Sequence, residues 1–491
     1  MRFNSFEYIF LLVATVCVYY LLPHKARRIM LLASSFAFYA GWNAKYLLLM
    51  FAVIIITYIA AILIVRYDAK KKPIMITAVL TLILLLFYFK YLNFVIHSIN
   101  YVLHTEFDLW NIVLPVGISF YIFQSMGYVI DVYRDSSKCE KNLITYALFI
   151  SFFPQLVAGP IERSKNMLDQ FKVKQEFKLE NLKNGRTLVL VGLVEKVVIA
   201  DRLAIFVTNT FDKYQQCSPL ALILATVYFA FQVYCDFNAY SLIAIGSAKM
   251  LGFRLMRNFN NPYLSRSFAE YWSRWHISLS TWFQDYIFTP FVWSNPLKKI
   301  SSRFSKPPMR TGLFLVFFVS GFWHGAKWTY VIWGLIHALY RCVAATVAKP
   351  KKKFYKKYNI PQNNMFFIIG QILTVFVLNC FTYIFFRANT IGHALSYIKC
   401  IFTNTSIDSL ALNTLGLNSG DIIFSIGCII LLTVCQIVIE CRFKDKMIDQ
   451  IIDERNIFTQ SVIYASLFLL IVVFGQYGIN YVENPFIYFQ F

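Results

Sequence analysis

Charged side chains are scarce in this sequence. Only 15% of its 491 residues are Asp, Glu, Lys or Arg, whereas a soluble globular domain carries about a quarter. Hydrophobic residues make up 58% of the chain and aromatic residues 18%, and the mean hydropathy is +0.55. Apolar runs long enough to cross a bilayer recur along the chain. The composition therefore excludes a soluble protein and predicts a polytopic membrane protein.

Acidic residues are the scarcer of the two charge types. The chain has 25 Asp and Glu against 47 Lys and Arg, which gives a net charge of +22. A basic balance of this size can indicate nucleic-acid binding. Here the basic residues gather in short segments beside apolar runs, as the positive-inside rule expects. We therefore predict contact with membrane lipid, no nucleic-acid partner, and cytoplasmic exposure of residues 163–186, 249–310 and 347–358.

The motifs of several chemistries are missing. The ten Cys are scattered without C-x-x-C spacing, which argues against a disulfide framework or a cysteine metal site. No two of the seven His stand at the i,i+4 spacing of a helical zinc site, and we expect no metal and no bound cofactor. The sequence also lacks a G-x-S-x-G elbow and a phosphate-binding Walker loop. These absences exclude the commonest hydrolase and nucleotidase sites.

The hydropathy pattern predicts an all-α polytopic membrane protein. We expect a single membrane domain over residues 1–491, a bundle of about eleven transmembrane helices with shorter re-entrant and interfacial helices. The first apolar run, residues 6–22, is followed by basic residues rather than preceded by them. A signal peptide has the opposite order, so we expect a retained span.

Two stretches are predicted to depart from simple crossings. A crossing at 143–158 would place the basic residues 163–186 outside, so we expect 143–160 to be re-entrant or to lie partly flat, turning at Pro154 and Gly159-Pro160. Residues 268–288 are predicted to form one helix lying at the membrane interface.

The apolar stretch 186–207 carries four charged residues, and a structural charge cluster facing the bundle is the favoured interpretation. These charged residues are Glu195, Lys196, Asp201 and Arg202.

The stretch Ser320-Gly321-Phe322-Trp323-His324-Gly325 lies between apolar runs at 311–321 and 329–339. Two apolar arms that return to one side of a membrane would place His324 near or inside the bilayer. An ionisable group at that depth is costly and indicates a functional site, although a His can also simply hydrogen-bond between helices. A buried neutral imidazole could act as the general base when a hydroxyl attacks a thioester. The residues alone leave both interpretations open.

Ten segments of the chain, taken in order, carry a further signal. The two most distinctive are Arg274-Trp275-His276-Ile277-Ser278-Leu279-Ser280 and Gly321-Phe322-Trp323-His324-Gly325. The others are 114–121, 130–134, 153–161, 197–202, 236–237, 245–246, 258–263 and 486–491. Each segment is weak evidence alone, but the ordered set covers most of the chain. Together the segments resemble the membrane-bound O-acyltransferase (MBOAT) superfamily, and in particular its bacterial branch that acetylates cell-envelope polysaccharides. One departure is Thr289-Pro290-Phe291-Val292, where the branch usually has Ile-Pro-Leu-Gly-Gly, and it leaves the acceptor open.

The resemblance implies the roles of specific residues. The His of the Trp-His-Gly motif, essential for acyl transfer in the family, is His324 here, and the second family position is His276, which would orient or polarise the substrate. We further expect a tunnel or substrate path lined by Trp323, Gly325, Asp236, Asn260, Trp275 and Ser278.

The resemblance also implies an activity. An acyl group, acetyl in the first instance, would pass from a cytoplasmic thioester donor such as acetyl-CoA across the bacterial inner membrane. The acceptor would be a cell-envelope or exported polysaccharide, an alginate-like glycan or peptidoglycan, served by an extracytoplasmic SGNH-type acetyltransferase or a polysaccharide-export partner. D-alanyl transfer to teichoic acid is the alternative within the family. A proton-coupled transporter or flippase is the alternative outside the enzymes.

Overall fold

The computed structural model describes residues 3–157, 159–294, 309–362, 364–404, 412–444, 446–477 and 486. Within these ranges the chain forms helices and no β-strand, which confirms the all-α prediction. Seven described helices are long and apolar enough to cross a membrane, and the predicted number of about eleven stays a prediction. Most of the basic segment before Arg310, residues 298–308, and the C-terminal residues 487–491 lie outside the described residues.

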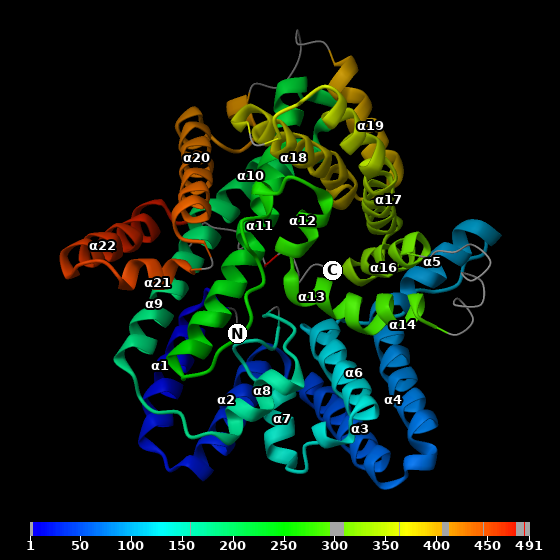
Figure 1. Cartoon of the computed structure of the whole chain (residues 1–491), viewed down its shortest axis with the longest axis vertical. Coiled ribbons are helices and arrows are strands. Elements are labelled where there is room, and N and C mark those ends of the chain that lie inside the picture. Colours follow the sequence, from blue (N-terminus) through cyan, green and yellow to red (C-terminus); the bar gives the residue numbers. More distant parts are fainter. Residues whose placement is uncertain are drawn as a thin grey trace. The chain divides into compact units, whose positions relative to one another are not determined.

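The described chain divides into two compact units. The first comprises Met1–Leu193, Ala239–Arg257 and Met447–Phe468. Its helices are α1 (Phe6–Leu21), α2 (His24–Asn43), α3 (Lys45–Arg66), α4 (Lys71–Leu86), α5 (Leu92–Leu103), α6 (Ile118–Arg134), α7 (Leu143–Ser151), α8 (Ser164–Lys172), α9 (Leu179–Leu193) and α21 (Ile448–Asp453), with the last part of α11 (Pro219–Met250) and most of α22 (Ile457–Phe474). Helices α3, α4 and α6 pack side by side (Figure 1).

The stretch predicted to be re-entrant contains a short helix followed by irregular backbone. Helix α7 has 9 residues, which is roughly 14 Å at about 1.5 Å per residue and too short for a hydrocarbon core of about 30 Å. The chain after Ser151 is buried, and the backbone N–H of Phe153 donates to Ser35 Oγ at 3.1 Å. Irregular backbone is tolerated at membrane depth only when protein surrounds it in this way. The placement of this stretch in a membrane stays a prediction.

Glu162 ends this irregular stretch with a buried carboxylate, 2% exposed. Its Oε2 accepts a hydrogen bond from Asn166 Nδ2 at 2.6 Å, and its Oε1 accepts one from the backbone N–H of Met256. Burial disfavours the charged form more than these donors stabilise it, and it raises the pKa of Glu162 to about 7. The loop between α7 and α8 is therefore tied to residue 256 through a group that titrates near neutral pH.

We expect the stability of the protein to depend on pH through Glu162. Because the pKa in the folded state, about 7, lies above the ordinary value of 4.5, the folded state holds this proton more tightly. The resulting stabilisation is fully present below about pH 4.5 and is lost as the pH rises through about 7, and it amounts to about 3 kcal/mol at about 1.36 kcal/mol per pH unit. Thermal unfolding in detergent should show a flatter pH dependence for Glu162→Gln. Glu180→Gln, at an exposed position, should keep the wild-type slope, and a wild-type slope in Glu162→Gln would refute the assignment.

The second unit comprises Val194–Asn238, Asn258–Lys446 and Leu469–Phe491. Its elements are the π-helical turn η4 (Val194–Ala200), α10 (Asp201–Asp212), the first part of α11, α12 (Phe268–Arg274), α13 (Ile277–Phe283), the π-helical turn η7 (Gln284–Phe288), α14 (Thr289–Val292), α16 (Met309–His324), α17 (Trp328–Lys357), α18 (Met365–Arg387), α19 (Ile391–Thr403), α20 (Ser419–Arg442) and the end of α22. Helices α16 and α17 form a hairpin, and α18 packs against α17 (Figure 1).

The prediction of one helix over residues 268–288 is wrong. Helix α12 ends at Arg274, His276 adopts a left-handed conformation with φ 43°, and α13 begins at Ile277. Two backbone hydrogen bonds to a distant segment hold the break, from Asn260 N to Arg274 O and from Ile277 N to Asn258 O, both 2.9 Å. Tertiary pairing thus overrides the local helical pattern. Trp275 and Trp282 are buried, so the segment packs inside the unit.

Two glycines bring α16 and α17 to backbone contact. A Cβ on Gly334 would lie 2.2 Å from the carbonyl oxygen of Phe317, and one on Gly321 would lie 2.5 Å from that of Tyr330. Real Cβ atoms do not approach so closely, so any side chain at either position would separate the helices. The close crossing sets where the last residue of α16, His324, lies against α17.

Candidate active site

His324 lies at a meeting point of three helices of the second unit. It ends α16 and is 2% exposed. Its ring lies edge-on to that of Trp333 of α17 at 4.8 Å and to that of Phe386 of α18 at 5.4 Å between centroids, and it contacts its neighbour Trp323 at 5.0 Å. An aromatic box of this kind fixes the orientation of the imidazole and keeps bulk water away from it.

Gly325 completes the Trp-His-Gly motif for a steric reason. A Cβ at this position would lie 2.3 Å from Cε2 of Tyr330. The ring of Tyr330 packs in turn against Phe386 at 4.9 Å, and Phe386 forms one wall beside His324. Glycine at 325 is therefore needed for the turn between α16 and α17 to close over the Tyr330 ring.

The second predicted histidine belongs to the same cluster of rings. His276 is 1% exposed and contacts Phe237 of α11 at 4.6 Å and Trp323 at 5.6 Å between ring centroids. Trp323 thus lies against both His276 and His324. The structure brings both histidines into contact with one indole, although 48 positions separate them in the sequence. Their catalytic roles stay predictions.

The polar partner of His276 is Asn258. The Nδ1 atom of His276 lies 3.1 Å from Asn258 Oδ1, and the same oxygen accepts hydrogen bonds from Ser278 N at 3.3 Å and Ser278 Oγ at 3.0 Å. Burial lowers the pKa of His276 to about 3, because desolvation disfavours the imidazolium. His276 is therefore neutral at physiological pH.

Two other predicted residues, Trp275 and Asn260, lie beside this histidine and serve its backbone and packing. The Trp275 ring stacks on Tyr271 at 5.6 Å and contacts Phe259 at 5.0 Å. Asn260 donates its backbone N–H to the carbonyl of Arg274. Their predicted part in lining a substrate path stays a prediction.

Asp236 of α11 belongs to a buried ion cluster. Its carboxylate lies 2.7 Å from Lys196 Nζ, and the same ammonium lies 2.8 Å from Asp201. All three side chains are buried, as the interpretation of 186–207 as a structural charge cluster requires. The residue after Asp236, Phe237, contacts the ring of His276. Asp236 therefore adjoins the histidine cluster through its neighbour, and its predicted contact with substrate stays untested.

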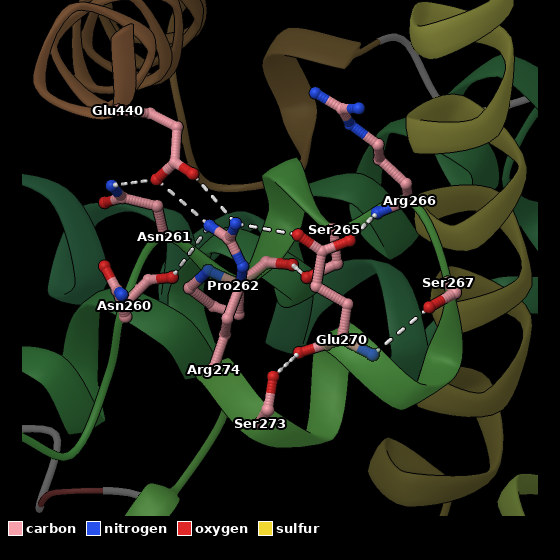
Figure 2. A network of polar contacts seen from close by, with 10 residues as sticks. All are labelled: Asn260, Asn261, Pro262, Ser265, Arg266, Ser267, Glu270, Ser273, Arg274 and Glu440. Carbon is pink, nitrogen blue, oxygen red and sulfur yellow. Dashed lines mark hydrogen bonds and ion pairs between the residues drawn. The ribbon is translucent and has the colours of Figure 1, made fainter. Parts of the chain in front are cut away.

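Arg274 was not singled out by the sequence, yet it holds the segment before His276 in place. Its guanidinium donates to both carboxylate oxygens of Glu440 at 2.8 and 3.0 Å, to Glu270 Oε1 at 2.7 Å and to the carbonyl of Asn260 at 3.4 Å. Figure 2 shows the guanidinium between the two carboxylates, with Glu440 reaching it from α20. The one available signal was an acidic residue, Glu440, close to the end of a long apolar run.

We expect Arg274→Lys to lower acyl transfer about tenfold in kcat, with little change in KM. Lysine keeps the charge but cannot form the paired hydrogen bonds to Glu440, and the loss of one such bond is worth about 1.4 kcal/mol. Steady-state kinetics of the purified protein would measure the effect. Arg266→Lys is the matched control, because the Arg266 side chain is exposed and only its backbone N–H bonds Glu270. Equal activity of the two variants would remove Arg274 from this role.

Comparison with known proteins shows the family of this chain. The family model for MBOAT, the membrane-bound O-acyltransferase family, matches residues 34–384, a range that includes His276 and His324. The chain is 39% identical over 352 residues to a probable alginate O-acetylase AlgI of Pseudomonas aeruginosa, covering 70% of this chain and 66% of that protein. It is 32% identical over 400 residues to a peptidoglycan O-acetyltransferase of Helicobacter pylori, covering 76% and 73%.

A more distant relative is named for a different acyl group and a different acceptor. A teichoic acid D-alanyltransferase of Bacillus subtilis is 29% identical over 287 residues, covering 58% of this chain and 71% of that protein. The family model spans well over half of the chain, and the O-acetyltransferase relatives exceed 30% identity. The chain therefore belongs to the membrane-bound O-acyltransferase family, alongside relatives from its polysaccharide O-acetylation branch, and it is an O-acyltransferase.

Proposed function

We propose that this O-acyltransferase moves an acetyl group from acetyl-CoA toward a polysaccharide hydroxyl, with His324 as the general base. The observation that carries the proposal is the position of His324, buried at the end of α16 and joined to His276 through Trp323. The naming of the relatives at 32–39% identity as O-acetylases and an O-acetyltransferase supports acetyl as the group transferred.

The proposed reaction balances without a cofactor. His324 takes the proton of the receiving hydroxyl as its oxygen attacks the thioester carbonyl carbon. The tetrahedral intermediate collapses, the carbon–sulfur bond breaks, and the thiolate of CoA leaves. The imidazolium of His324 then returns its proton to that thiolate. The products are an O-acetyl ester and free CoA, and the imidazole is regenerated.

The acceptor we propose is a cell-envelope or exported polysaccharide of a bacterium, with the enzyme in the inner membrane. Alginate is the substrate named for one relative and peptidoglycan for another, and both carry free hydroxyls. An extracytoplasmic SGNH-type acetyltransferase would relay the acetyl group where the glycan does not reach the membrane. D-alanyl transfer is the less supported candidate, because the D-alanyltransferase relative is 29% identical against 39% for the alginate O-acetylase.

Reconstitution of the purified protein in lipid vesicles would test the proposal. Acetyl-CoA labelled in the acetyl group is supplied on one side, and alginate or peptidoglycan oligosaccharides are supplied on the other. We expect labelled ester on the oligosaccharide or on an added SGNH-type partner, together with free CoA. Release of no CoA from acetyl-CoA, with D-alanine transferred from a loaded carrier protein, would establish the alternative. A transporter or flippase would produce neither ester nor free CoA.

A further inference from the structure

The hydrogen bonds around Asn258 identify which atom of its side chain faces His276. The backbone N–H of Ser278 lies 3.3 Å from the atom assigned as Asn258 Oδ1. A backbone N–H can only donate, so the atom that it meets must be the amide oxygen. The two ends of an Asn amide are otherwise hard to tell apart. Here the neighbouring backbone settles the orientation.

The orientation of Asn258 determines where His276 carries its proton. Nδ1 of His276 lies 3.1 Å from this same oxygen, which can only accept. Nδ1 must therefore be the donor and carry a hydrogen. A neutral imidazole has one N–H, and burial keeps His276 neutral at physiological pH. The lone pair of the ring is then on Nε2.

We propose that Asn258 is a positioning residue that holds His276 in the Nδ1–H tautomer, so that His276 meets substrate as a hydrogen-bond acceptor through Nε2. This inference rests on the proposed function and sharpens it. An acceptor cannot polarise a thioester carbonyl, which needs a donor, so His276 does not have the polarising role that the family resemblance allows. It instead holds a substrate group that carries an N–H or O–H.

The chemistry of the reactants limits what that group is. The receiving hydroxyl has one proton, and His324 takes it in the proposed reaction. The group bound by His276 is therefore a second donor close to the reacting atoms. Acetyl-CoA supplies one, since an amide N–H lies two carbons from its thioester sulfur. A polysaccharide supplies another, a hydroxyl next to the one that is acetylated.

The backbone around His276 is built to keep this arrangement. Asn258 binds the histidine segment twice, through its side chain and through its carbonyl, which accepts from Ile277 N at 2.9 Å. The charged side chains on the adjoining segments, Arg274 and Asp236, are themselves paired with Glu440 and Lys196. Among the described residues, the rings of Phe237, Phe259 and Trp323 lie against His276. A change in the partner of Nδ1 should therefore act directly on the titration of His276.

Two substitutions of Asn258 test the tautomer. Asn258→Asp keeps an oxygen for Nδ1–H but adds a negative charge, which raises the pKa of His276, so Nε2 becomes protonated at a higher pH. We expect the pKa of His276, followed by NMR of the ¹⁵N-labelled imidazole in the folded protein, to move up by at least about one unit. Asn258→Leu fits the site without any acceptor and should lose about tenfold in kcat at all pH values. Asn364→Asp is the matched control, because Asn364 caps α18 with its side-chain oxygen and Asp caps equally well.

Donor analogues test the acceptor role without adding a buried charge. Wild type and His276→Ala are compared with acetyl-CoA and with ethyl thioacetate, which has no N–H. A loss of about tenfold with acetyl-CoA and little loss with ethyl thioacetate assigns Nε2 to the amide of the CoA arm. Equal losses with both donors assign it to the polysaccharide hydroxyl. No loss with either donor, or an unmoved pKa of His276 in a folded Asn258→Asp protein, overturns the inference. A wild-type protein that transfers no acetyl group would instead refute the proposed function itself.

Discussion

Replacing His324 with Ala is expected to reduce acyl transfer by about 10²- to 10⁴-fold, the range that a general base contributes. The protein should still insert and fold, because His324 lies at the end of α16 and its ring packs among the rings of Trp323, Trp333 and Phe386, which hold one another in place. His324→Gln should fail to a similar degree. Its amide fits the space and can hydrogen-bond, but it cannot take a proton from the receiving hydroxyl.

Release of CoA and formation of labelled ester would measure the loss, with circular dichroism and size-exclusion chromatography as checks on folding. His337→Gln is the matched control. His337 is also buried, contacts Trp333 at 4.9 Å and hydrogen-bonds Thr382 Oγ1 at 3.2 Å, which suits a packing role between α17 and α18. We expect it to keep transfer within about threefold of wild type. Substantial transfer by His324→Gln would mean that His324 only positions its neighbours, and the base would have to be sought elsewhere.

The part of this site that sequence could predict is the part set by local pattern. Two apolar arms around Gly321-Phe322-Trp323-His324-Gly325 predict a helical hairpin with His324 at its tip, and α16 ends at that residue. Family resemblance supplied His276 as the second histidine. The walls of the site come from Trp333 and Phe386, which lie on later helices and share no spacing with His324. Hydrophobic periodicity within one helix does not predict a contact between residues on different helices.

The conformation of His276 shows why the rest of the site could not be predicted from the sequence. The sequence around it has an amphipathic pattern with helix-forming residues on both sides, so a continuous helix was the natural prediction. The chain instead breaks at a left-handed residue that pairs with Asn258, 18 positions earlier. A non-glycine residue in that region carries local strain, and only tertiary hydrogen bonds offset it. Strain of this kind at a candidate site is invisible to propensity, because the compensating contacts are not local.

The position of Asn258 was recognised as part of a motif, but no role followed from it. An Asn in a segment without a helical or strand pattern is usually interpreted as a turn residue. Its function depends on the direction of one amide oxygen, and that direction depends on the N–H of Ser278. Arg274 is similar, since its importance rests on Glu440 at the far end of α20. Sequence located these residues near the site, and geometry was needed to say what they do.

Lys196 is where we expect the largest effect on stability. Its ammonium lies between the carboxylates of Asp201 and Asp236, with all three side chains buried, and its Nζ also lies over the ring of Phe486 at 4.3 Å. Lys196→Met keeps the length of the side chain but leaves two buried carboxylates facing each other without a cation between them. Removing one partner from a buried ion cluster costs about 3–5 kcal/mol, a large part of a typical total stability of about 5–15 kcal/mol.

Thermal unfolding in detergent should therefore show a steep fall in the midpoint for Lys196→Met. Lys213→Met, at an exposed position of the same unit, should change stability by less than about 0.5 kcal/mol.

Adding Asp201→Asn and Asp236→Asn to Lys196→Met should restore much of the lost stability, because a buried cluster replaced as a whole by neutral groups no longer carries an unpaired charge. Rescue of the midpoint together with acyl transfer would confine the cluster to a structural role. Rescue of the midpoint without transfer would show that Asp236 serves the reaction, as its neighbour's contact with His276 allows. A wild-type midpoint in Lys196→Met alone would contradict the ion cluster altogether.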